Sequence, residues 1–168
     1  MQWSSDLYIS YLFNAYTQSI VERMQARINE MAFNFHGFEL TNFFAWLEAT
    51  RERKFYRIPL SMPIGFTGAW FTDEEFPYEY IIFNGNLPTS EQQFIQLHEV
   101  SHFLCGHQTV RINGDRLCRW INELRSRSGR LYLRQGHPER ILREEIEAEA
   151  LAFLIQRRAC VEQHITHV

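Results

Sequence analysis

Two histidines and a glutamate stand close together in the stretch QLHEVSH at residues 96–102. Four residues of an α-helix turn through about 400°, so His98 and His102 project from one helix face, one turn apart. Their imidazoles can therefore bind the same metal ion, and Glu99 lies beside them. This HExxH pattern is typical of zinc sites in which the glutamate is the general base.

Zinc held in this way keeps an open position for water, lowers the pKa of that water to about 7 and polarises a carbonyl group. Glu99 can accept the proton from the water and deliver it to the leaving amine of a peptide. The motif thus predicts zinc-dependent peptide hydrolysis, with His98 and His102 as metal ligands and Glu99 as the catalytic residue.

The motif by itself is short, since roughly 3 in 100 shuffled sequences of this composition would contain HExxH. A structural pair of histidines is therefore the alternative interpretation. The surroundings favour the metal site, because the motif falls within a helical stretch whose apolar residues can anchor it, namely Phe94, Leu97, Phe103 and Leu104.

A third ligand must come from elsewhere in the chain. The pattern HExxHxxGxxH is excluded, because Cys105 and Gln108 stand where it requires Gly and His, and His107 misses the register by one residue. We therefore expect a carboxylate from the later segment REEIEAEALAF, residues 143–153.

Glu145 and Glu149 lie four residues apart, on the same helix face as Ala148 and Ala152. The small alanines allow this helix to approach the HExxH helix closely. We predict that Glu145 is the third ligand and that Glu149 accepts the free N–H of a ligating histidine. The reverse assignment, with Glu149 as the ligand, stays open. The other alternative is that these glutamates form the solvated side of an acidic first helix turn and bind no metal.

Apolar periodicity predicts a first helix from the cap at residues 4–6 to about residue 34, and a second from Leu40 to about Arg51. A short helix is expected around residues 116–126. A final helix should begin near Pro138.

The helix that carries the motif should begin at Thr89 and Ser90, each followed three residues later by Gln, as in a capping box. It should end at Gly106. Before it, GFTGAWFT and YEYIIFN are rich in aromatic and β-branched residues and predict two short antiparallel strands joined by a loose loop. We expect residues 78–84 to be an edge strand along which a substrate segment could lie.

The chain has 168 residues, of which 45% are apolar and 15% aromatic, enough for one well-filled core. No repeat or linker divides it. We expect an α+β, zincin-like single domain over residues 1–168, mainly helical, with a small antiparallel sheet preceding the HExxH helix. Residues 1–57 would be an N-terminal helical scaffold and residues 58–160 the catalytic core.

A net charge of −3 provides no general attraction for nucleic acid or an anionic membrane. The N-terminus lacks the features of a signal peptide or membrane span. Cys105, Cys118 and Cys160 show no CxxC spacing, which argues against a disulfide framework and a zinc ribbon. A cytoplasmic location is the simplest expectation, with no membrane partner.

The segments LHEVSHFLCGH at 97–107 and EIEAEALAFLIQRRA at 145–159 resemble the ImmA/IrrE metallopeptidases of bacteria and phages, particularly the short stand-alone forms. The similarity covers about residues 58–160. It implies that the HExxH histidines bind zinc, that Glu99 is the general base and that Glu145 completes the site. The family usually has Gly or Ala at Ser101, and Asn or Asp is common at Glu149.

The resemblance also implies a partner, because such proteins cleave or otherwise relieve a helix-turn-helix repressor. We therefore expect a zinc endopeptidase acting on a repressor protein. The alternative is a non-catalytic, zinc-stabilised interaction module, such as a toxin–antitoxin or anti-repressor component. Nucleic-acid binding is a weaker third possibility that would use the arginines of one segment: Arg111, Arg116, Arg119, Arg125, Arg127, Arg130 and Arg134.

Several further side chains could take part in the chemistry, but the sequence assigns them no role. A donor to the developing oxyanion could come from Tyr78, Tyr80, His107, Tyr132 or His137. Cys105 could approach the metal as a redox sensor, although an inert buried thiol is the alternative. His164 and His167 lie near the end of the chain and are not expected to be ligands.

Overall fold

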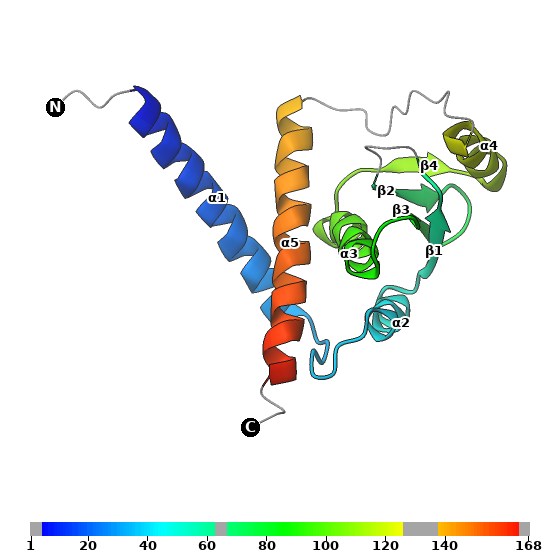
Figure 1. The fold of residues 1–168 in the computed structure, drawn as a ribbon, viewed down its shortest axis with the longest axis horizontal. Coiled ribbons are helices and arrows are strands. Elements are labelled where there is room, and N and C mark those ends of the chain that lie inside the picture. The colour runs from blue at the N-terminus through cyan, green and yellow to red at the C-terminus, as the bar shows by residue number, and fades with distance from the viewer. Residues whose placement is uncertain (1–4, 63–66, 126–137, 165–168) are drawn as a thin grey trace.

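The computed structural model of the chain describes residues 5–62, 67–125 and 138–164. These residues confirm the predicted α+β class (Figure 1). The elements follow in the order α1 (Ser5–Glu30), α2 (Leu40–Arg51), β1 (Lys54–Leu60), β2 (Gly68–Asp73), β3 (Tyr78–Asn84), α3 (Thr89–Cys105), β4 (Val110–Ile112), α4 (Gly114–Arg125) and α5 (Pro138–His164).

The helices lie close to their predicted positions. α2 has the predicted bounds, α5 begins at Pro138, and α1 ends at Glu30, about four residues early. α3 ends where predicted, because Gly106 adopts a left-handed conformation with φ 73°. The predicted capping box is wrong: the N-cap is Pro88, without a side-chain cap, and Gln92 donates to the Leu87 carbonyl at 2.7 Å.

The sheet differs from the prediction in size and direction. β2 and β3 form the expected antiparallel pair, but β1 is parallel to β3 and β4 is parallel to β2. The strand order β1-β3-β2-β4 makes β3 an interior strand. The prediction that residues 78–84 form an edge strand is therefore wrong, and the sheet is mixed.

Both missed strands carry weak local patterns. β1 contains Pro59, which breaks regular structure in most settings but is tolerated on an edge strand. β4 has only three residues and follows α3 in the chain. β1 also crosses the boundary expected at residue 57, so the sheet begins within the segment assigned to the scaffold.

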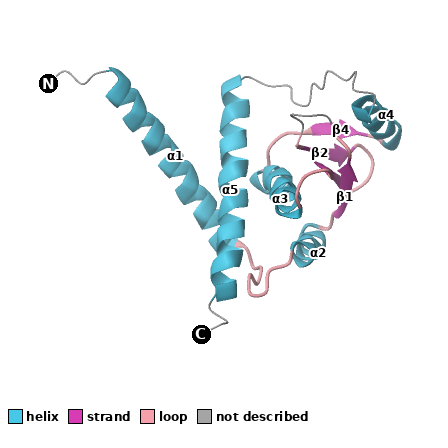
Figure 2. Ribbon diagram, in the orientation of Figure 1, coloured by secondary structure: helices cyan, strands magenta, loops and turns pink. Residues whose placement is uncertain are grey.

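Helices cover both faces of the sheet (Figure 2). On one face, Ile81 packs in a core shared by α1, α2, α3 and α5. On the other face, the next residue, Ile82, packs with Leu117 and Leu124 of α4, because successive strand side chains point to opposite faces. Along the described part of the chain, no helix combines the length and apolar character that crossing a membrane requires.

The turn between β2 and β3 is held by Asp73, which is 5% exposed. Its Oδ1 accepts the N–H groups of Glu75 and Phe76, each at 2.9 Å, and its Oδ2 accepts the Tyr80 hydroxyl at 2.8 Å. Burial raises the pKa of Asp73, but these hydrogen bonds outweigh burial and lower it below 3.8. The Asp73 carboxylate thus holds this turn through three hydrogen bonds.

We expect Asp73→Ala to lower the free energy of unfolding by about 1–3 kcal/mol, because three partly buried donors lose their acceptor. The pKa of Asp73 is lower in the folded chain than the unfolded value of 3.8. Its ionic contribution is therefore present above pH 3.8 and lost as pH falls through the folded pKa. Urea unfolding at neutral and acidic pH measures both effects, and an Asp73→Ala variant as stable as the parent would contradict them.

Candidate metal centre

Helices α3 and α5 bring the predicted site residues together. The two helices pack side by side, as the contacts between them and Figure 1 show. Ala148 and Ala152 of α5 and Ser101 of α3 are fully buried. The Ser101 hydroxyl donates to the Leu97 carbonyl of its own helix at 2.7 Å, so burying it leaves no unmet hydrogen bond.

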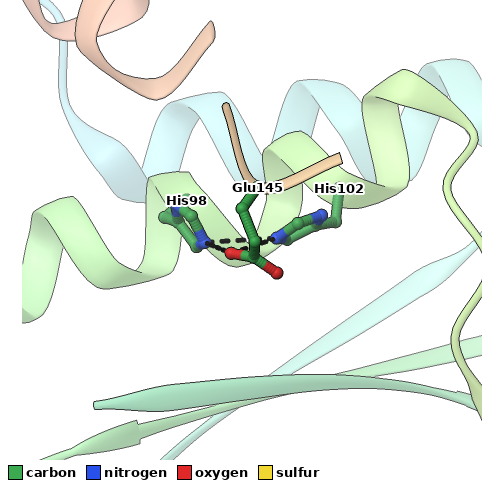
Figure 3. Close-up of side chains that lie close together, drawn as sticks. All are labelled: His98, His102 and Glu145. Atoms are coloured by element: carbon green, nitrogen blue, oxygen red, sulfur yellow. Dashed lines mark hydrogen bonds and ion pairs between the residues drawn. The ribbon is translucent and has the colours of Figure 1, made fainter. Parts of the chain in front are cut away.

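His98, His102 and Glu145 converge on one point between the helices and the sheet (Figure 3). The two histidine Nε2 atoms are 3.1 Å apart, and Glu145 Oε2 lies 3.2 Å from His98 Nε2 and 3.6 Å from His102 Nε2. Ligand atoms bound to one tetrahedral zinc ion at about 2.0–2.2 Å are about 3.3–3.6 Å apart. The donor set therefore fits zinc, although imidazole and carboxylate also suit other divalent metals.

The outer nitrogen of His98 has a carboxylate partner. His98 Nδ1 lies 3.1 Å from Glu149 Oε2. Because an ionised carboxylate only accepts hydrogen bonds, the His98 nitrogen that faces Glu149, Nδ1, carries a proton, and Nε2 is the nitrogen that would bind a metal. The structure thus brings Glu149 to the place predicted for it, with Glu145 at the centre.

The electrostatic surroundings favour positive charge at this point. Burial lowers the pKa of His98, but the hydrogen bond with Glu145 and the charges of Glu99, Glu145 and Glu149 outweigh burial and raise it. A proton or a metal ion can supply the favoured charge.

The cluster is buried on one side and open on the other. The His102 side chain is 1% exposed, whereas those of His98 and Glu145 are 18% and 42% exposed. A cavity of about 280 Å³ separates the cluster from the start of β2 and is lined there by Thr67–Trp70. Glu99 lines the same cavity and is 7% exposed. The pair of histidines is therefore not sealed in a dry interior.

Two residues without a predicted role complete the surroundings. His107 Nδ1 lies 2.8 Å from His102 Nδ1, and His107 Nε2 lies 3.0 Å from Glu147 Oε2. Burial raises the pKa of Glu147, but hydrogen bonds from His107, Arg143 and Arg23 outweigh burial and lower it to about 2. The sequence hint was the turn at Gly106, which ends α3 and allows the next residue to fold back.

The other candidate donors lie away from the cluster or outside the described residues. The Tyr80 hydroxyl binds Asp73, and Tyr78 packs against Tyr56 and Phe76. Both tyrosines alternate with Ile81 and therefore point to the face of the sheet opposite α3. Tyr132, His137 and His167 lie outside the described residues, and the side chain of His164 is not described.

The arginine segment is described only in part. Arg111 donates to the Glu74 carbonyl at 3.0 Å, and Arg116 pairs with the Glu74 carboxylate at 2.7 Å. Arg119 is exposed on α4. Three of the remaining arginines, Arg127, Arg130 and Arg134, lie outside the described residues. Nucleic-acid binding through this segment stays a prediction.

Cys105 turns toward α1, where its Sγ lies 3.7 Å from Met24 Sδ. Burial raises the pKa of its thiol from 9.0 to about 11, whereas Cys118 and Cys160 are exposed. We expect Cys105 to react with Ellman's reagent at pH 8 about 100-fold more slowly than an ordinary thiol, because the thiolate is the nucleophile. Cys105→Ser should remove only this slow phase, and three equally fast thiols would contradict the prediction.

Comparisons of the chain with protein-family models, with curated proteins and with solved structures give no match. The resemblance to the ImmA/IrrE metallopeptidases therefore stays a prediction. A function for the chain rests on its own residues and their geometry.

Proposed function

We propose that the chain is a zinc-dependent endopeptidase that cleaves a protein substrate, a helix-turn-helix transcriptional repressor. One observation carries the proposal: two imidazole nitrogens and a carboxylate oxygen lie 3.1–3.6 Å apart at a partly open cavity that Glu99 also lines. Three protein ligands beside an open position are characteristic of catalytic zinc sites. The repressor as substrate follows from the resemblance of residues 97–107 and 145–159.

Each site residue has a separate task in the proposed reaction. His98, His102 and Glu145 would hold the zinc ion, which, when bound, acidifies water and polarises the scissile carbonyl. Glu99 accepts the proton of the attacking water and delivers it to the leaving amine. Glu149 holds His98 with its proton on Nδ1, so that Nε2 faces the site.

Because residues 78–84 form an interior strand, we assign substrate binding to the start of β2 instead. The backbone N–H of Asn84 donates to the Thr67 carbonyl at 2.8 Å. Because backbone groups of successive strand residues point to opposite sides, those of Gly68, which follows Thr67, point away from β3. Among the described strands, β4 pairs only with Phe71–Asp73 on that side. An extended substrate segment could therefore add to β2 at Gly68, across the cavity from His98.

The test uses Glu99→Gln, which keeps the size of the side chain but cannot act as a base. The purified protein with zinc is incubated with candidate helix-turn-helix proteins, beginning with any encoded beside its gene, and fragments are identified by mass spectrometry. We expect Glu99→Gln to retain zinc and to cleave about 10²–10⁴-fold more slowly. Glu91→Gln, an exposed position on the same helix, is the matched control and should cleave normally.

The same variant separates the enzyme from the non-catalytic interaction module. If binding alone relieves repression, Glu99→Gln should keep its full effect on a reporter gene in cells. No cleavage by the parent protein with any divalent metal, together with this retained effect, would overturn the peptidase proposal.

A further inference from the structure

A chain of hydrogen-bonding groups runs from the back of His102 to α1. His102 Nδ1 lies 2.8 Å from His107 Nδ1, and His107 Nε2 lies 3.0 Å from Glu147 Oε2. Glu147 Oε1 accepts from Arg23 Nη2 of α1 at 2.7 Å and from Arg143 Nε at 2.9 Å. The side chains of His102, His107 and Glu147 are 1%, 5% and 10% exposed, so solvent has little access to these three groups.

The hydrogen bonds between these side chains all run in one direction, toward Glu147. Glu147 faces two guanidinium groups and acts only as an acceptor, so His107 donates from Nε2. A neutral His107 then presents a lone pair at Nδ1, which accepts the Nδ1 proton of His102. His102 is left with a lone pair on Nε2, the atom that faces His98 and Glu145.

The backbone turn after α3 makes this arrangement possible. Gly106 has φ 73°, and the N–H of His107 donates to the His102 carbonyl at 3.0 Å. The His107 ring is thereby folded back behind His102. On the other side of the cluster, the outer nitrogen Nδ1 of His98 faces Glu149, whose side chain is 61% exposed, so this hydrogen bond competes with water.

We propose that His107 is a positioning residue that fixes the tautomer and orientation of His102, and that Glu147 and Arg23 link α1 to the metal affinity of the site. This inference rests on the metal site of the proposed function, but not on peptidase activity. The N-terminal helix α1, which packs against α5, thereby becomes part of the metal centre.

The first test measures zinc affinity by competition with a chromogenic chelator. We expect His107→Leu to bind zinc about 10–100-fold more weakly, as is usual when the partner of a ligating histidine is lost. His107→Gln keeps both an acceptor and a donor and should be affected less than His107→Leu. If the parent binds no zinc, the proposed function itself fails; if the parent and His107→Leu bind equally well, only this inference fails.

A second set of variants tests the link to α1. Arg23→Gln combined with Arg143→Gln should weaken zinc binding about 3- to 10-fold, because Glu147 loses both of its charged partners. Arg27→Gln is the matched control, since Arg27 also lies on α1 but donates to the Leu104 carbonyl and not to Glu147. Equal affinity of the double variant and the control would overturn the role of Arg23.

A third measurement needs no substitution and covers the case in which His107→Leu does not fold. Long-range ¹⁵N–¹H NMR of the zinc-bound parent protein identifies the tautomer of each imidazole. We expect the proton of His102 on Nδ1 and that of His107 on Nε2. A His107 ring protonated on Nδ1, or on both nitrogens, would overturn the proposal.

Discussion

Glu145→Gln is expected to weaken zinc binding by about 100-fold or more, beyond the range usual for the partner of a ligand. Glu145 Oε2 lies within 3.6 Å of both histidine Nε2 atoms, whereas Glu149 Oε2 lies 3.1 Å from the outer nitrogen of His98 alone. Glutamine keeps the length of the side chain and removes its charge. Chelator competition and the metal content of purified protein measure the loss.

Glu149→Gln is the matched comparison on the same helix. Its side chain is 61% exposed, so its hydrogen bond to His98 competes with water and its loss should weaken zinc binding by about 10-fold or less. Zinc at about 100 times its dissociation constant should stabilise the parent by about 2.7 kcal/mol and Glu145→Gln by much less. If Glu149→Gln loses the metal and Glu145→Gln keeps it, the two carboxylates have exchanged roles.

Gly68→Ala is expected to damage both stability and hydrolysis. A Cβ atom on Gly68 would lie 2.5 Å from Ile95 Cγ2, 3.0 Å from Glu99 Oε1 and 3.1 Å from the Ile82 carbonyl oxygen. The Ile82 carbonyl belongs to an interior strand and cannot move without the sheet. Overpacking of this kind costs about 1–3 kcal/mol, and the shift that relieves it displaces the proposed general base.

Thermal unfolding and the rate of substrate cleavage measure the two effects of Gly68→Ala separately. Gly114→Ala is the matched control, because a Cβ atom there meets nothing within 4 Å, and its stability should change by less than about 0.5 kcal/mol. Removing the closest contact with Ile95→Ala should restore part of the stability in the Gly68→Ala background. Gly68→Ala with the stability and cleavage rate of the parent would show that β2 does not approach Glu99 in this way.

Local sequence was sufficient wherever one helix sets the geometry. The spacing of His98 and His102 determines that both point to one side of α3, because the helical rotation per residue is constant. Gly106 ends α3 because it adopts a left-handed conformation without steric cost. Glu145 and Glu149 share a face of α5 for the same reason of spacing.

The positions of Glu145, Glu147 and Glu149 relative to the histidines depend on the packing of α5 against α3. Spacing alone does not determine which face of α5 points to the histidines. In the structure, Glu145 faces both Nε2 atoms, Glu149 faces the outer edge of His98, and Glu147 points to His107. No single-helix pattern could distinguish these positions, since they depend on the rotation of α5 about its axis.

The pairing of the strands and the contact of His107 with His102 are likewise determined by tertiary structure. β3 looked like an edge strand because its neighbour β1 contains Pro59 and was not predicted as a strand, and β4, which pairs with β2, has only three residues. His107 reaches His102 only because the chain reverses at Gly106, and its partner Glu147 lies 40 residues further on. The sequence by itself determined the donors and their spacing on each helix. Contacts between distant segments decided where those donors meet, because nothing within a helix or strand specifies its neighbours.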